Sequence, residues 1–83
     1  MRRVERVQTG VRVEKRLIKV MKALAERLDM PLGELIEGVM LHAMEGSLPF
    51  GEATLKEIGL LKQVYGLDLT AEDSHRMTEG ESR

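Results

Sequence analysis

The sequence predicts a mostly α-helical fold with one short β-strand near its N-terminal end. Residues 7–13 alternate between apolar and polar side chains with a period of two, which is typical of a strand. Residues 15–29 and 31–45 instead carry apolar side chains at helical spacing. These patterns indicate a core in residues 1–46, with a basic arm at 1–6, and a linker with a helical C-terminal extension in residues 47–83.

The predicted strand at residues 7–13 presents two different faces. One face is mostly apolar and consists of Val7, Thr9, Val11 and Val13. The opposite face consists of Gln8, Gly10 and Arg12. A lone strand cannot satisfy its own backbone N–H and C=O groups, and no second strand is evident in the chain. We therefore expect the partner strand to come from a second copy, which makes the protein a homodimer.

Two amphipathic helices follow the predicted strand. The apolar stripe of the first consists of Leu17, Val20, Met21, Leu24, Ala25 and Leu28. Pro31 ends that helix, because proline disfavours helical geometry in the residue before it, and it suits the first turn of the next helix. The second stripe consists of Leu32, Leu35, Ile36, Val39, Met40 and Ala43.

The C-terminal extension has weaker helical signals. After a linker at 47–51, Leu55, Ile58 and Leu61 support a third helix that Gly66 closes. Thr70 and Asp73 resemble a capping box, so a short fourth helix is expected to begin there. The polar residues 79–83 are expected to fray.

Charge is divided unevenly along the 83 residues. Residues 1–27 carry nine Lys/Arg against three Glu, a net charge of +6, whereas residues 28–83 carry a net charge of −7. A basic first third on an acidic chain favours a polyanionic partner for that third alone. Because no long apolar run is present, we expect neither a membrane span nor a signal peptide, and a cytoplasmic location.

No cofactor, metal site or enzymatic activity is expected. The chain lacks cysteine, so neither a disulfide nor a thiolate site can support a core that is small for a free-standing domain. Carboxylates and a histidine cluster at Asp68, Glu72, Asp73 and His75, but their spacing matches no metal motif.

The strand-helix-helix order resembles the ribbon-helix-helix superfamily of the Arc, MetJ and CopG repressors. The residues that carry the resemblance are Val11-Arg12-Val13, Leu17, Met21, Leu24–Leu28, Glu34-Leu35-Ile36 and Val39-Met40. The resemblance implies an intertwined ribbon-helix-helix homodimer, with a two-stranded ribbon that enters the major groove of DNA.

The resemblance also implies roles for individual residues. Base contacts would come from Gln8, Gly10 and Arg12, with Gly10 allowing close backbone approach. Phosphate contacts would come from Arg2, Arg3, Arg6, Lys15, Arg16, Leu32 and Gly33. The dimer core would consist of Val7, Thr9, Val11, Val13, Leu17, Met21, Leu24, Leu28, Leu35, Ile36, Val39 and Met40. The second helix lacks the hydroxyl and basic side chains with which the family clamps a phosphate, so that contact is expected to be weak.

The expected function is a sequence-specific DNA-binding transcriptional regulator that acts as a repressor. It would bind double-stranded DNA as a homodimer, with a tetramer as a further assembly. Two alternatives remain open: an antitoxin whose residues 51–78 bind a protein partner, and a dimeric interaction module that does not bind DNA.

Overall fold

The described residues, 1–80 of a computed structural model, contain three α-helices and one short 3₁₀ turn. The helices are α1 (Lys15–Arg27), α2 (Leu32–Met44) and α3 (Glu52–Tyr65), and the turn is η1 (Ala71–Asp73). Residues 81–83, the last part of the tail that was expected to fray, lie outside the described residues. None of the helices in residues 1–80 is long and apolar enough to cross a membrane.

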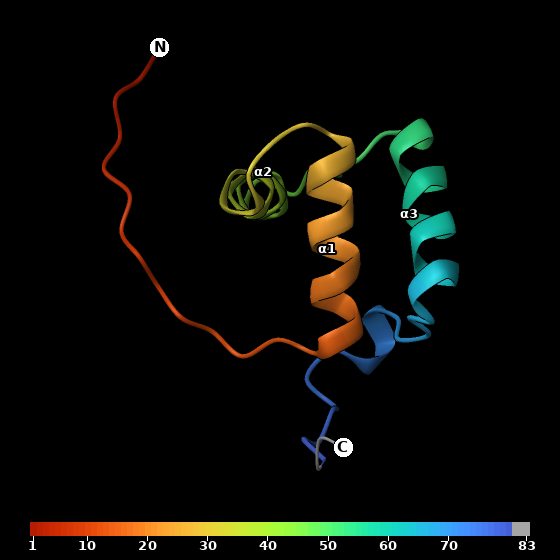
Figure 1. Ribbon diagram of the computed structural model, residues 1–83. Helices are drawn as coiled ribbons and strands as arrows, with labels where there is room; N and C mark the ends of the chain where they lie inside the picture. Colours follow the sequence, from red (N-terminus) through yellow and green to blue (C-terminus); the bar gives the residue numbers. More distant parts are fainter. Residues whose placement is uncertain (81–83) are drawn as a thin grey trace.

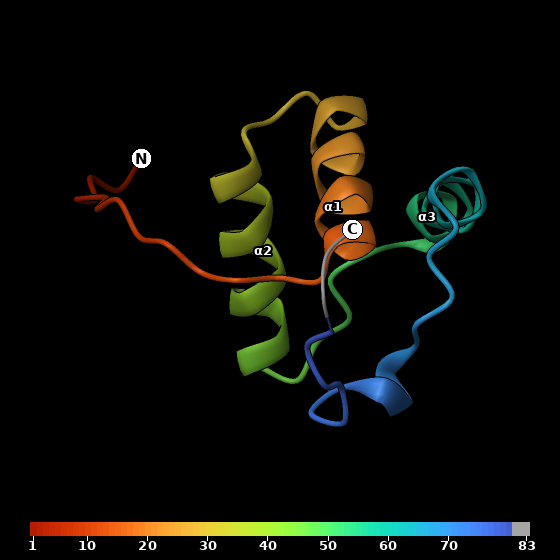
Figure 2. The ribbon, with the colours of Figure 1, turned by 60° about the horizontal axis from the view of Figure 1, so that its bottom comes forward.

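The three helices form a row with α1 in the middle. Figure 1 shows α3 antiparallel to α1 on one side, and α2 on the other side, seen nearly end on. In the turned view of Figure 2, α1 again lies between α2 and α3. Within the described part of the chain, α2 and α3 both pack against α1 and not against each other.

The predicted β-strand is wrong, and with it the ribbon-helix-helix fold class. Residues 1–80 contain no strand, and residues 7–13 form part of an extended N-terminal segment that leads away from the helices (Figure 1). Val7 and Val11 are 80% and 74% exposed, respectively. Alternating side chains are compatible with an extended backbone, but a strand also needs a neighbouring backbone to bond to, and no other segment in residues 1–80 supplies one.

Local contacts determine where each helix begins and ends. Glu14 caps α1, because its side chain accepts a hydrogen bond from the Leu17 N–H at 2.9 Å. Pro31 precedes α2 in an extended conformation, and Gly66 ends α3 in the left-handed region at φ 65°. The predicted capping box is present at η1, where the Thr70 N–H donates to Asp73 Oδ2 at 2.8 Å.

The hydrophobic core is small and lies where the three helices and the segment after α3 meet. Its buried residues are Val20, Leu24, Ala25, Leu35, Leu61 and Leu67. None of the large side chains is completely enclosed in residues 1–80. At the far end of α1, an ion pair joins Arg27 to Glu57 of α3 at 2.5 Å.

Candidate functional site

The basic N-terminal segment, residues 1–13, is an extended arm on the α2 side of the molecule (Figure 2). The three residues predicted to contact bases, Gln8, Gly10 and Arg12, are all exposed within this arm. They do not share a sheet surface, because no sheet forms in the described residues. Arg12 forms an ion pair with Glu79 of the C-terminal segment.

Arg6, predicted to contact phosphate, is held by α2. Its Nε and Nη2 donate to the two carboxylate oxygens of Glu37 at 2.8 and 2.9 Å. This bidentate geometry raises the pKa of Arg6 and lowers the pKa of Glu37, chiefly through the side-chain hydrogen bonds. Both side chains are exposed, so the pair orients the arm more than it stabilises the fold.

Arg16, also predicted to contact phosphate, forms hydrogen bonds within the fold. Its Nη1 donates to the Gly66 carbonyl oxygen at 3.0 Å and to Asp68 Oδ1 at 2.9 Å, and its Nε donates to Glu14 Oε2 at 3.2 Å. These contacts raise the pKa of Arg16, mainly through the hydrogen bond with Glu14. Arg16 therefore connects the start of α1 to the end of α3. Sequence reasoning missed these contacts of Glu14 and Asp68. Glutamate is not a usual helix cap, and the Arg16–Asp68 contact across 52 residues has no local signal.

The remaining predicted cations have no acidic partner within residues 1–80. Arg2 and Arg3 are exposed at the start of the arm. Lys15 is exposed on α1, where Lys19 and Lys22 lie four and seven residues further along. This spacing places the three side chains on one side of a helix, which we call the lysine face. The two groups provide five exposed positive charges.

The N-terminus of α2 is the other predicted phosphate contact. Leu32 and Gly33 lie in its first turn, before the residues whose N–H groups donate to the Pro31 carbonyl oxygen. Pro31 supplies no side-chain cap, and Glu34 adds a negative charge in the same turn. A phosphate would meet a carboxylate there, so this terminus is a poor anion site.

The predicted dimer core is split by the structure. Leu24 and Leu35 are buried within the single chain, and Val39 is partly buried beside them. Met21 is half-buried, and the remaining eight residues are exposed: Val7, Thr9, Val11, Val13, Leu17, Leu28, Ile36 and Met40.

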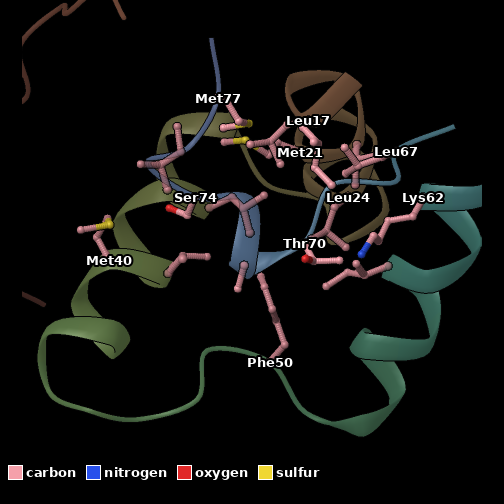
Figure 3. Close-up of a pocket in the computed structure, with 17 residues that line it drawn as sticks. Leu17, Met21, Leu24, Met40, Phe50, Lys62, Leu67, Thr70, Ser74 and Met77 are labelled. Atoms are coloured by element: carbon pink, nitrogen blue, oxygen red, sulfur yellow. The ribbon is translucent and has the colours of Figure 1, made fainter. Parts of the chain in front are cut away.

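Several of these residues border an apolar groove of about 540 Å³. Its walls are α1, α2, residues 67–77, and Ile58 and Lys62 of α3, with Phe50 at its base (Figure 3). Leu17, Ile36, Met40 and Met77 line it while they remain 36–52% exposed. Among the described residues, no arm side chain lines the groove.

Residues 51–78, the segment considered for a protein partner, fold against α1. Leu61 and Leu67 contribute to the core, whereas Leu55, Leu60 and Val64 of α3 are exposed. Within residues 1–80, no group of three His, Asp or Glu side chains is placed to hold a metal ion. The cluster at Asp68–His75 instead contains the η1 capping box.

The structure thus replaces a two-stranded reading surface with an exposed basic arm, a lysine face and an apolar groove. Comparisons with protein-family models, with curated proteins and with solved structures found no match to this chain.

Proposed function

We propose that this protein is a DNA-binding regulator that contacts the phosphates of a duplex through Arg2, Arg3 and the lysine face. The observation that supports the proposal is that Arg2, Arg3 and the three lysines, all within residues 1–22, are exposed and have no acidic partner in residues 1–80. Phosphate neutralisation by such cations supplies most of the affinity of sequence-independent DNA binding.

The extended arm suits this role because it leads away from the helices. An arm that makes no regular structure can follow the phosphate backbone next to the site where α1 docks. The proposal does not include base readout by a two-stranded ribbon, because residues 7–13 form no strand. Arg12, the arginine assigned to a base, forms an ion pair with Glu79 instead.

A salt titration tests the proposal. Fluorescence anisotropy with a duplex from upstream of the protein's own gene should show binding whose log K falls with log salt by about 4 to 5 per chain, if all five cations engage phosphate. A scrambled duplex of equal composition measures sequence preference, which a regulator requires. Absence of binding at low salt, or binding that does not respond to salt, would contradict the proposal.

Charge removal from the lysine face sharpens the test. The triple variant Lys15→Gln, Lys19→Gln, Lys22→Gln should lower the salt slope by about 2.7 per chain and weaken all duplexes alike. The matched control is Lys56→Gln, which removes an exposed charge from α3, distant in sequence from the arm. If the triple variant and the control have the same slope of log K against log salt, the lysines of α1 do not contact the DNA.

A protein-interaction module that does not bind DNA is the second candidate. The apolar groove favours it, as do the three arginines that the chain's own carboxylates hold, namely Arg6, Arg12 and Arg16. Under this alternative, the salt titration shows no binding to the duplex, and the apolar groove binds a protein partner.

A further inference from the structure

The extended ends of the chain and the apolar groove together leave the molecule with more exposed surface than a compact monomer has. A folded chain of 9.4 kDa is expected to expose about 5,000 Å², whereas this chain exposes 7672 Å². A standard protein interface buries about 800 Å² on each partner. The excess is therefore large enough to supply a stable interface, even though part of it belongs to the extended ends of the chain.

The arm has the apolar side chains that such a groove could accept. Val4, Val7 and Val11 are 65%, 80% and 74% exposed, and the arm is narrow because it is extended. Its own groove does not hold it. Glu14 and Arg16 fix the start of α1 against Asp68, and the arm leaves that point toward the outer side of α2 (Figure 1).

Charge complementarity matches the arm to two of the segments that border the groove, namely α2 and residues 67–80. Residues 1–13 carry a net charge of +3. Helix α2 carries Glu34 and Glu37 with no Lys or Arg, and residues 67–80 carry a net charge of −3. Among the described residues, none of these acids lines the groove itself, where Lys62 is the one charged side chain. Arg6 and Arg12 already pair with one acid of each of these two segments, Glu37 and Glu79. One chain therefore displays both halves of a complementary surface on separate parts of the molecule.

We propose that the groove binds residues 4–13 of a second copy of this chain, in a reciprocal exchange of arms. The side chains of Val7 and Val11, which share one face of the extended arm, would enter the apolar groove, and the arginines would pair with acids beside it. Two complementary surfaces on each copy form a closed two-fold dimer, because each arm contacts the helices of the other copy. The arms bind helices in this arrangement and do not need to pair with one another.

Cysteine cross-linking tests the exchange directly, since the chain has no cysteine of its own. Val7→Cys in the arm and Met40→Cys in the groove are made in separate chains, and the two variants are mixed under oxidising conditions. A disulfide-linked heterodimer between them is expected. The matched control pairs Val7→Cys with Leu60→Cys, which is exposed on α3 outside the groove and should cross-link far less.

Solution mass provides the second test. Sedimentation equilibrium without DNA should give a dimer whose Kd rises by about 100-fold in Val7→Asp, because each of the two arms loses one buried valine. Val64→Asp adds the same charge at an exposed site on α3 and should leave the Kd unchanged. Circular dichroism verifies folding, and Val7 lies outside every helix.

Three results would overturn the exchange. The first is a monomer at every concentration up to the millimolar range. The second is a Val7→Cys, Met40→Cys double variant that closes its disulfide within one chain, which would place the arm in its own groove. The third is a dimer with equal Kd in both aspartate variants. None of these measurements contains DNA, so their outcome is separate from that of the salt titration, in which the lysine-face variant changes DNA binding and leaves the dimer intact.

Discussion

Glu14 is the residue at which the chain changes from an extended arm to a folded domain. Its carboxylate accepts the Leu17 N–H and also contacts Arg16, which reaches across to α3. Ser, Thr, Asp and Asn are the usual caps, so a glutamate in this position gives no sequence signal of a helix start. One carboxylate thus couples the first turn of α1 to the end of α3.

Glu14 makes stability sensitive to acid. The hydrogen bond from Leu17 is the main reason that the pKa of Glu14 lies below its ordinary value of 4.5. A lowered pKa means that the folded state prefers the carboxylate, so its stabilising effect is fully present above pH 4.5 and is lost as the pH falls through the lower, folded-state pKa. Glu37 adds to the same window, because Arg6 lowers its pKa.

Glu14→Gln should reduce the melting temperature by several degrees at pH 7, and should flatten its decline below pH 4.5. Thermal unfolding followed by circular dichroism from pH 3 to pH 7 measures both effects. Glu26→Gln is the control, since it is exposed on the same helix without an ion pair in residues 1–80. If Glu14→Gln keeps the acid dependence of the unaltered chain, the cap does not contribute to it.

At the scale of elements, the period of the apolar side chains located the helices well. The spacing of the apolar side chains and the position of Pro31 predicted helices at 15–29 and 31–45. The structure has α1 at Lys15–Arg27 and α2 at Leu32–Met44. Gly66 was expected to close a third helix and does so with φ 65°. Helical hydrogen bonds are local, so the sequence of one segment is enough to predict them.

Contacts between distant segments could not be predicted in this way. A strand depends on a second backbone, so the alternation in residues 7–13 was compatible with an arm that pairs with nothing in residues 1–80. The groove also depends on residues 67–77 crossing α1 and α2, and no pattern within that segment indicates where it docks. The same holds for the pairing of Arg16 with Asp68.

Alanine substitutions at two glycines in or next to α3 should change the stability of the fold in opposite directions. Gly59 lies in the middle of the helix with no atom within 4 Å of an added Cβ, so Gly59→Ala should stabilise the fold by about 0.5–1 kcal/mol. Gly66 has open space as well, but its positive φ makes Gly66→Ala unfavourable by about 1 kcal/mol. Urea denaturation measures both changes. If both variants change the free energy of unfolding in the same direction, the left-handed conformation at Gly66 is contradicted.

At the scale of the whole molecule, the arm and the helices behave as separate parts. The radius of gyration of the Cα atoms is 14.0 Å, whereas a compact chain of this length is expected near 12 Å. Within residues 1–80, the ion pairs that join the arm to the rest are those of Arg6 and Arg12, and both are exposed. Exposed ion pairs contribute little to stability.

Deletion of residues 1–13 should therefore leave the helical domain folded. At a concentration below the Kd of the proposed dimer, the melting temperature should be unchanged, and small-angle X-ray scattering should give a smaller radius of gyration for the monomer. The deletion keeps Glu14, so α1 retains its cap. Loss of the helical signal would show that the arm is part of the folded core.

The central place of α1 also has a consequence for how fast the chain folds. Four residues separate α1 from α2, so their contact closes a very short loop, and α3 needs only to dock on the opposite side of a helix that already exists. Helical proteins with such local connectivity fold within about microseconds to milliseconds. Since α2 and α3 both pack on α1, opening this helix disrupts both interfaces, and its amide protons should be the last to exchange with solvent.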